Sequence, residues 1–417
     1  MASVAAVLLL AAAIAGLVWL PRAGFAAPFA LGALAVASGL VSPVGAADAL
    51  RPLLAPLAFV LCAVPLAVLL DELGFFEEVA RLVGGSRHYL GACWVLAGAV
   101  TALLNLDAAV VMLTPLYVRV AERRRVPAIV LCLQPLLLSC LASSALPISN
   151  LTNLVATPVA GLSTLGFLEH LAPPTLAAST VGWWCYLRLL RRDEFAGRPE
   201  GPGASRARLR AAPSAGIAAD TRAPDRRLLA LAGAFVMACV AGFIAAPSIG
   251  AAPYEVAAGG DVVLVALTRR LPWRAVPGRS VVTVLGLGVL ADALATHVPI
   301  DSLLGGSSPA GMLRDVGVLA VGGSALNNLP ALLVTLHRLA AHGSWSLWAA
   351  LAGDNIAPLA LPTGTLAALL WLETVHRLGV RFRERDYLRV AWRVALPSLV
   401  AAVAVLLGLR AAFGPGQ

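Results

Sequence analysis

Four polar side chains stand close together in the middle of an apolar segment: Ser149, Asn150, Thr152 and Asn153. They follow Pro147, which cannot donate a backbone N–H and clashes with the preceding turn, so a helix through this segment must break. Hydroxyl, amide and freed backbone groups at bilayer depth can bind a small polar solute or an ion, and carriers use broken helices in this way. A polar loop at the membrane surface would explain the stretch equally well, and the remainder of the chain decides between the two.

Three other apolar segments are interrupted in a similar way. Asn105 and Asp107 divide an apolar run in the first half of the chain, and Asn327 and Asn328 divide one in the second half. A further interruption contains Asp354, Asn355, Thr363 and Thr365. All these side chains are amides, hydroxyls or acids, and none is Arg or Lys. They suit a small neutral solute with several hydroxyl groups, because an organic dianion would be buried without a compensating cation.

Asp107 is the residue that we expect to couple transport to an ion. An ionisable side chain inside a membrane segment is a functional hypothesis by default. Because burial favours the neutral form of a carboxyl group, Asp107 could take up and release a proton. Its alternative role is to cap the second arm of a hairpin, and Asp354 could cap a half-helix in the same way.

The composition places these residues in a membrane protein. Of the 417 residues, 59% are hydrophobic and 13% are charged, and the mean hydropathy is +0.86. A soluble domain is about half apolar and about a quarter charged. The net charge of +9 comes from arginines in the loops between apolar runs, which is the pattern that sets membrane topology, so we expect no nucleic-acid partner. The six cysteines predict small buried side chains, with a thiolate site for a soft metal or metalloid as the alternative.

Apolar runs of about twenty residues predict ten crossings of the bilayer. Two further runs, 89–120 and 311–339, hold about thirty residues each, whereas two crossings need about forty. Each run is therefore predicted to be a re-entrant hairpin with its polar tip at mid-membrane, and one long kinked helix is the alternative. The expected crossings are 3–20, 26–44, 52–70, 127–167 (broken), 172–190, 228–247, 252–267, 280–298, 346–372 (broken) and 391–411.

The chain divides into two halves joined by a hydrophilic segment. Residues 188–227 are rich in Arg, Pro, Gly and Ala and predict a flexible linker, which its arginines place in the cytoplasm. Residues 1–187 and 228–417 each hold five crossings, one hairpin and one broken helix. Because an odd number of crossings inverts the second half, we predict an all-α polytopic membrane protein of two inverted repeats, with both termini on the outer face.

Five motifs, in this order along nearly the whole chain outside the linker, carry a resemblance to a known family. They are LLDELGFFEEVA (69–80), LDAAVVMLTP (106–115), LPISNLTNLV (146–155), ALNNLPALL (325–333) and GDNIAPLALPTGTLAALLWL (353–372). The chain resembles the arsenite efflux permease family (the ArsB type of arsenical pump membrane protein) within the ion transporter superfamily.

The resemblance implies a secondary transporter, not an enzyme, that exports arsenite or antimonite through the plasma (inner) membrane in exchange for protons. No cofactor or metal is expected, and a homodimer and a soluble arsenite-stimulated ATPase subunit are candidate partners. Departures from the family pattern at Leu106 and Leu361 keep a sodium-coupled anion or dicarboxylate carrier, or a sodium/proton antiporter, as the alternative. An intramembrane enzyme using Asp71, Asp107 and Asp354 is the alternative from another class.

Overall fold

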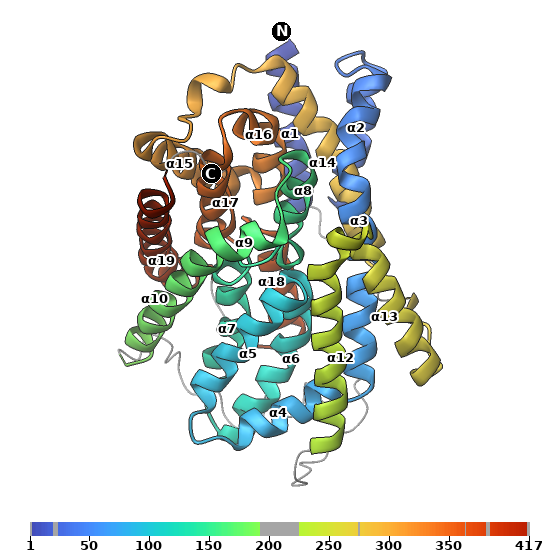
Figure 1. Cartoon of the computed structure of the whole chain (residues 1–417), viewed down its shortest axis with the longest axis vertical. Helices are drawn as coiled ribbons and strands as arrows, with labels where there is room; N and C mark the ends of the chain where they lie inside the picture. The colour runs from blue at the N-terminus through green and yellow to red at the C-terminus, as the bar shows by residue number, and fades with distance from the viewer. Residues whose placement is uncertain are drawn as a thin grey trace.

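The computed structural model describes six stretches of the chain, and every regular element in them is a helix. The stretches are 2–19, 24–191, 225–273, 276–362, 364–380 and 384–414. The prediction of an all-α protein is therefore confirmed for this part of the chain. The two ends of the chain both lie in the upper half of the molecule as drawn in Figure 1.

The first half contains three helices, an amphipathic helix, a helical hairpin, a broken helix and a final helix. The three helices are α1 (Ala2–Trp19), α2 (Ala27–Ala37) and α3 (Pro43–Glu72). The amphipathic helix α4 (Phe75–Gly85) leads into the hairpin arms α5 (Tyr89–Leu103) and α6 (Leu106–Arg124). The broken helix consists of α7 (Ala128–Leu141), the 3-10 turn η2 (Pro147–Ser149) and α8 (Leu151–Val159), and α9 (Thr164–His170) and α10 (Ala172–Arg191) follow it.

The second half repeats this order without the amphipathic helix. Its first three helices are α12 (Arg226–Ala245), α13 (Pro253–Thr268) and α14 (Gly278–His297). Its hairpin arms are α15 (Pro309–Leu326) and α16 (Asn328–Ala341). The second broken helix consists of α17 (Ser344–Ile356), η6 (Ala357–Ala360) and α18 (Leu366–Arg377), and α19 (Glu384–Phe413) closes the chain.

Both segments predicted to be hairpins fold as pairs of packed helices, so the alternative of one long kinked helix is excluded. The first tip turns because Asn105 ends the helical backbone and caps α6, with its side-chain oxygen accepting a hydrogen bond from the Asp107 N–H at 2.8 Å. The second tip turns at Asn327, whose φ of 80° lies in a region that residues with a side chain rarely adopt. Each turn lies where the sequence placed its polar tip.

Both predicted helix breaks are also present, and one boundary was predicted wrongly. The chain leaves the helical conformation between Ala142 and Asn150 and again between η6 and Thr365. The first broken helix was expected to reach residue 167, but α8 ends at Val159 and α9 is bent from it by 115°. A positive φ at Gly161 and a side-chain cap from Ser163 to the Gly166 N–H at 2.9 Å produce this second bend.

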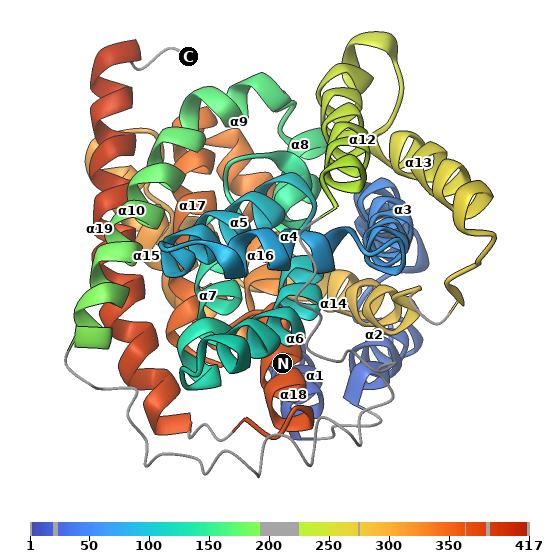
Figure 2. The ribbon, with the colours of Figure 1, turned by 90° about the horizontal axis from the view of Figure 1, so that it is seen from below.

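Helices from the two halves meet in matched pairs. Helix α3 packs on α13, and its counterpart α14 packs on α2 (Figures 1 and 2). In the same way, α6 packs on α18 and its counterpart α16 packs on α8. The last helices of the two halves, α10 and α19, pack on each other. Figure 1 places the hairpin of α5 and α6 in the lower half of the molecule and the hairpin of α15 and α16 in the upper half. The two halves therefore interlock around the two broken helices, which lie at the centre.

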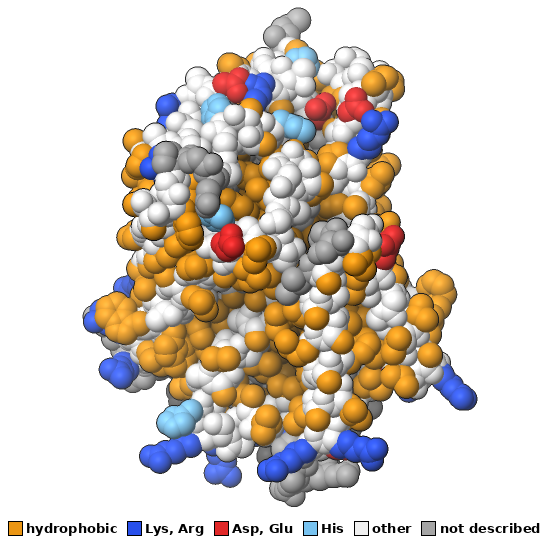
Figure 3. Space-filling view, in the orientation of Figure 1, with side chains coloured by type: hydrophobic (Ala, Val, Ile, Leu, Met, Phe, Trp, Pro, Cys, Tyr) orange, Lys and Arg blue, Asp and Glu red, His pale blue; other side chains and the backbone are white. Residues whose placement is uncertain are grey.

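The surface is that of a protein embedded in a bilayer. Hydrophobic side chains cover the middle of the face seen in Figure 3, and arginines cluster at its lower end. By length and composition, three described helices can cross a membrane: Pro43–Glu72, Arg226–Phe243 and Tyr387–Phe413. The bent pair of α8 and α9 would be a fourth, so the number of ten crossings stays a prediction.

Close packing between α15 and α17 gives a direct test of the fold. A Cβ at Gly353 would lie 2.6 Å from the carbonyl oxygen of Val316, so Gly353→Ala forces the two helices apart. We expect this change to lower the free energy of unfolding by about 1–3 kcal/mol, seen as a lower midpoint of thermal unfolding in detergent. Gly408→Ala in α19 is the matched control, because nothing lies within 4 Å of its Cβ position. Equal midpoints for the two variants would contradict this packing.

Candidate functional site

The amide of Asn355 joins the two halves of the chain at the centre of the molecule. Its oxygen accepts hydrogen bonds from the side chains of Asn150 at 2.7 Å and Thr152 at 3.0 Å. Its nitrogen donates to Asn153 Oδ1 at 2.8 Å and to Ser144 Oγ at 3.0 Å. The four contacts use the whole hydrogen-bonding capacity of one amide. We call these five residues the Asn355 cluster.

The first helix break supplies most of this cluster. Asn150 has an extended backbone and caps α8, with its side-chain oxygen accepting from the Thr152 N–H at 3.2 Å. Ser149 does not contact Asn355 but fixes the break, because its hydroxyl lies 2.6 Å from the carbonyl oxygens of both Ser143 and Leu146. The polar groups predicted from the sequence around Pro147 are thus brought together with Asn355 of the second half.

Sequence reasoning missed one member of the cluster, Ser144. Its hydroxyl accepts a hydrogen bond from Asn355, and the neighbouring Ser143 carbonyl oxygen accepts one from the Asn153 side chain at 2.8 Å. The signal was the pair Ser143 and Ser144, which lies two residues before Pro147 inside an otherwise apolar run. These residues are small and common in membrane helices, so composition alone does not mark them as functional.

Asp354 precedes Asn355 in α17 and lies in a different environment, next to the second hairpin. It is completely buried, and neither carboxyl oxygen has a hydrogen-bond partner among the residues that the structure describes. A Cβ at Gly323 in α15 would lie 3.1 Å from Asp354 Oδ1, so the helix can approach the acid only because this residue is a glycine. The thiol of Cys140 interacts with the Thr365 hydroxyl and lies near the Asp354 carboxyl group.

The second helix break is held against the tip of the second hairpin. The Asn328 N–H donates to the Gly364 carbonyl oxygen at 3.0 Å, and the Ser324 hydroxyl donates to the Ala357 carbonyl oxygen at 3.2 Å. Thr365 caps α18, with its hydroxyl accepting from the Ala368 N–H at 3.0 Å, so the interpretation of this segment as a break is correct. Thr363, also predicted as a site residue, lies outside the described residues.

The predicted capping roles of the two acids are wrong. Asn105, not Asp107, caps α6, and one carboxyl oxygen of Asp107 is buried without a partner. Asp354 lies near the end of α17 and has no contact with the start of a helix in the described chain. One oxygen of Asp107 and both oxygens of Asp354 therefore make no hydrogen bond to the described residues, so they are available to a proton or a bound ion.

The first hairpin tip packs near the first break but is not part of the Asn355 cluster. Leu103, at the end of α5, packs with Leu146 and Ile148 beside the break. The side-chain nitrogen of Asn105 is buried without a hydrogen-bond partner in the described part of the chain. The structure therefore places Asn105 and Asp107 at the edge of the polar centre, and Asp354 and Asn355 inside it.

Electrostatically, the centre is weakly acidic and has no cation. No described Arg or His forms an ion pair or hydrogen bond with Asp107 or Asp354. The described residues hold no group of three or more His, Cys, Asp and Glu side chains that could bind a metal ion. The polar atoms that remain are amide and hydroxyl groups, one carboxyl oxygen of Asp107 and both carboxyl oxygens of Asp354, and these three oxygens have no hydrogen-bond partner among the described residues.

Comparison with known proteins shows the family to which the chain belongs. Residues 1–364 match the family model described as citrate transporter (CitMHS). The chain belongs to the citrate transporter family, a branch of the ion transporter superfamily. It is therefore a transporter and a multi-pass protein of the plasma membrane.

Relatives within this family confirm the resemblance to the arsenical pumps. The arsenical pump membrane protein of Yersinia enterocolitica is 27% identical over 379 residues, which cover 82% of this chain and 83% of that protein. The protein of the same name from Escherichia coli strain K12 is 26% identical over 431 residues, covering 95% and 96%. The crystal structure of the YdaH transporter of Alcanivorax borkumensis matches with a TM-score of 0.54 at 16% identity, covering 89% of this chain and 87% of that one, so the likeness concerns the fold alone.

Asn355→Ala tests whether the Asn355 cluster holds the two halves of this citrate transporter family member together. The change leaves buried polar groups of the first break without a partner, at about 1–3 kcal/mol for each group that stays unpaired. We expect the midpoint of thermal unfolding to fall by at least several degrees, measured by size-exclusion chromatography after heating. Thr180→Ala is the control, since that exposed hydroxyl bonds only to Leu176 of its own helix. A midpoint as high as that of the control would contradict the role given to Asn355.

Proposed function

We propose that this chain exports arsenite or antimonite, as the neutral trihydroxides, in exchange for protons. The observation that carries the proposal is the Asn355 cluster, which presents amide and hydroxyl groups at the point where both broken helices meet. A trihydroxide can donate and accept hydrogen bonds with such groups when it replaces the hydrogen bonds that they make with one another, and it brings no charge that must be compensated. Its similarity to arsenical pump membrane proteins supports the same solute.

The two unpartnered acids are the proposed proton carriers. Asp107 is half-buried at the first hairpin tip, and Asp354 is fully buried beside the cluster. A carboxylate without a cation or hydrogen bond is costly in a membrane interior, so each acid is expected to change its protonation as the site faces either side. We propose Asp107 as the coupling acid and Asp354 as a second one, because Asp354 directly precedes Asn355 in the second broken helix.

A citrate or dicarboxylate carrier coupled to sodium is the second candidate. The family description favours it, and so does the arrangement of helices, because α8 and α18 both begin at the polar centre. The N-terminus of a helix carries a partial positive charge that attracts anions. Against this candidate, the centre already holds two acids and no described cation, so a dianion would meet repulsion that two helix ends would have to overcome.

The proposed mechanism uses the two halves, 1–187 and 228–417, as inverted repeats. The matched packing of α6 on α18 and α16 on α8 supports this arrangement. We propose that both hairpins and both broken helices move as a transport core against a scaffold of the remaining helices. We propose that the arginine-rich segment 188–227 lies in the cytoplasm. From the resemblance to the arsenical pumps, we also propose a homodimer and a soluble arsenite-stimulated ATPase subunit as partners.

Transport into everted membrane vesicles tests the function. With a proton gradient as the energy source, we expect arsenite uptake that a protonophore abolishes and that Asp107→Asn and Asp354→Asn each reduce by at least tenfold. The amide is isosteric with the acid but cannot take up a proton at this pH. Glu169→Gln is the matched control, because that acid is exposed on α9, away from both hairpins and from the Asn355 cluster.

Two results would count against this proposal. Sodium-dependent citrate uptake without arsenite uptake would move the protein to the second candidate. Full proton-driven arsenite uptake by both acid variants would keep the solute and remove the two acids from coupling.

A further inference from the structure

A cavity of about 200 Å³ lies between the proposed scaffold and the proposed transport core. Helices α3 and α14 form one wall, with Pro52 and Ala291 among the lining residues. Helices α8 and α16 form the other wall, with Val155 and Val159 on α8. Asp292, His337 and Arg338 add polar groups to this lining. We call this cavity the outer vestibule.

The outer vestibule continues the Asn355 cluster along α8. Thr152 is a member of the cluster, and Val155 and Val159 follow it after one and two turns on the same face of the helix. Val155 is completely buried and lines the vestibule one turn from Thr152. One helical turn, about 5 Å, is therefore the distance along α8 from the bound solute to this cavity.

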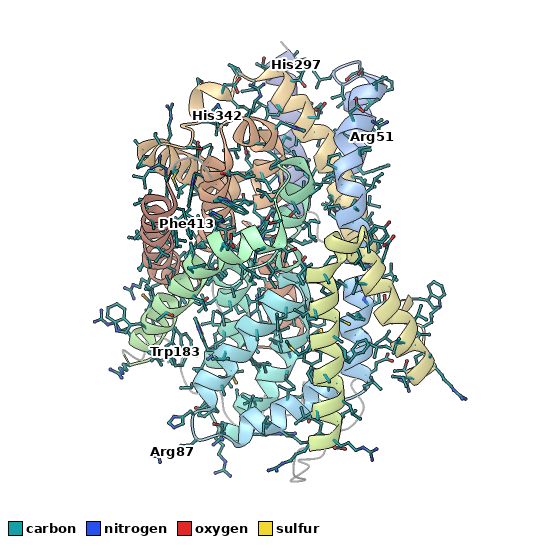
Figure 4. The ribbon with its side chains drawn as sticks, viewed as in Figure 1. Arg51, Arg87, Trp183, His297, His342 and Phe413 are labelled. Carbon is teal, nitrogen blue, oxygen red and sulfur yellow. The ribbon has the colours of Figure 1, made fainter. Side chains whose placement is uncertain are left out.

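The position of the outer vestibule matches the end of the molecule that we place outside. Asp292 lies about a turn and a half before His297 in α14, and Figure 4 shows His297 at the upper end, opposite Arg87. The Cβ position of Gly45, at the start of α3, lies 3.8 Å from Asp292 Oδ2, so the acid lies near the mouth. His297 itself bonds the Leu40 carbonyl oxygen at 3.0 Å.

Acids, histidines and one arginine lie around the mouth of the outer vestibule. Asp292 lies within electrostatic reach of His337, His297 and Asp48. Arg338 forms an ion pair with Asp301. A mixed rim of acids, imidazoles and one paired arginine has no strong net charge, so it favours neither an anion nor a cation. It offers hydrogen bonds to water and to a neutral hydroxylated solute.

We propose that the outer vestibule is the outer access path of the Asn355 cluster, a water-filled route for a small neutral hydroxylated solute in which Val155 is the barrier. The identity of the solute in this inference rests on the proposed function, whereas the location of the path rests on the cavity and its lining residues. A path between the part that moves and the part that stays can open without unfolding either one. The lining then widens when α8 and α16 move away from α3 and α14.

Cysteine accessibility tests this path without any transport measurement. A membrane-impermeant methanethiosulfonate reagent is added to the outside of intact cells that express Val159→Cys. We expect modification at least tenfold faster than for Leu34→Cys, whose side chain is exposed on α2 toward the lipid at the same end of the molecule. The wild-type chain is the background, since its six cysteines are buried or half-buried.

A second cysteine position gives an independent result if Val159→Cys fails to fold. Ala295→Cys places the thiol on the opposite wall, in α14, and is expected to react from the same side. Reaction of both positions at the Leu34→Cys rate, or reaction only in everted vesicles, would overturn the outer path. Rapid outside labelling in a protein that carries no arsenite would leave the path intact and reject only the proposed solute.

Discussion

The structure depends on one buried amide that has to satisfy groups from both halves of the chain. A helix broken inside a membrane exposes polar backbone and side-chain groups that have no water to bond to. Asn355 resolves this for the first break, because it accepts from Asn150 and Thr152 and donates to Asn153 and Ser144. The hydrogen-bonding needs of the first break are thus met by a residue of the other half.

This constraint explains why the polar centre is both rigid and incompletely satisfied. The amides and hydroxyls of the first break form a closed network, whereas the carboxyl oxygens of Asp354, one residue before Asn355, have no partner in the described chain. Satisfied groups hold the two halves in register, and the unpaired acid beside them provides a place for a proton. A carrier needs both, because the network fixes the geometry of the centre and the unpaired acid can bind a proton or an ion.

Local sequence signals predicted where helices break and turn better than they predicted which residues contact one another. Pro147 with the polar residues after it located the first break, and Asn105 and Asn327 located the hairpin tips, because each effect acts within a few residues. The pairing of Asn355 with Asn150 spans about half of the chain and could not be predicted from local patterns. The capping role considered as the alternative for Asp107 is filled by Asn105, since both residue types cap helices and only the backbone distinguishes them.

Ligand-dependent thermal stability of the purified protein tests the central claim most directly, namely that the Asn355 cluster binds a neutral trihydroxide. A ligand that binds only the folded state raises the unfolding midpoint with its concentration. Arsenite should raise the unfolding midpoint of the wild-type protein and of a variant in which all six cysteines are replaced. It should raise the midpoint of Thr152→Val much less. Citrate should leave the midpoint of the wild-type protein unchanged. A midpoint that rises with citrate, and is unchanged by arsenite, would contradict the account.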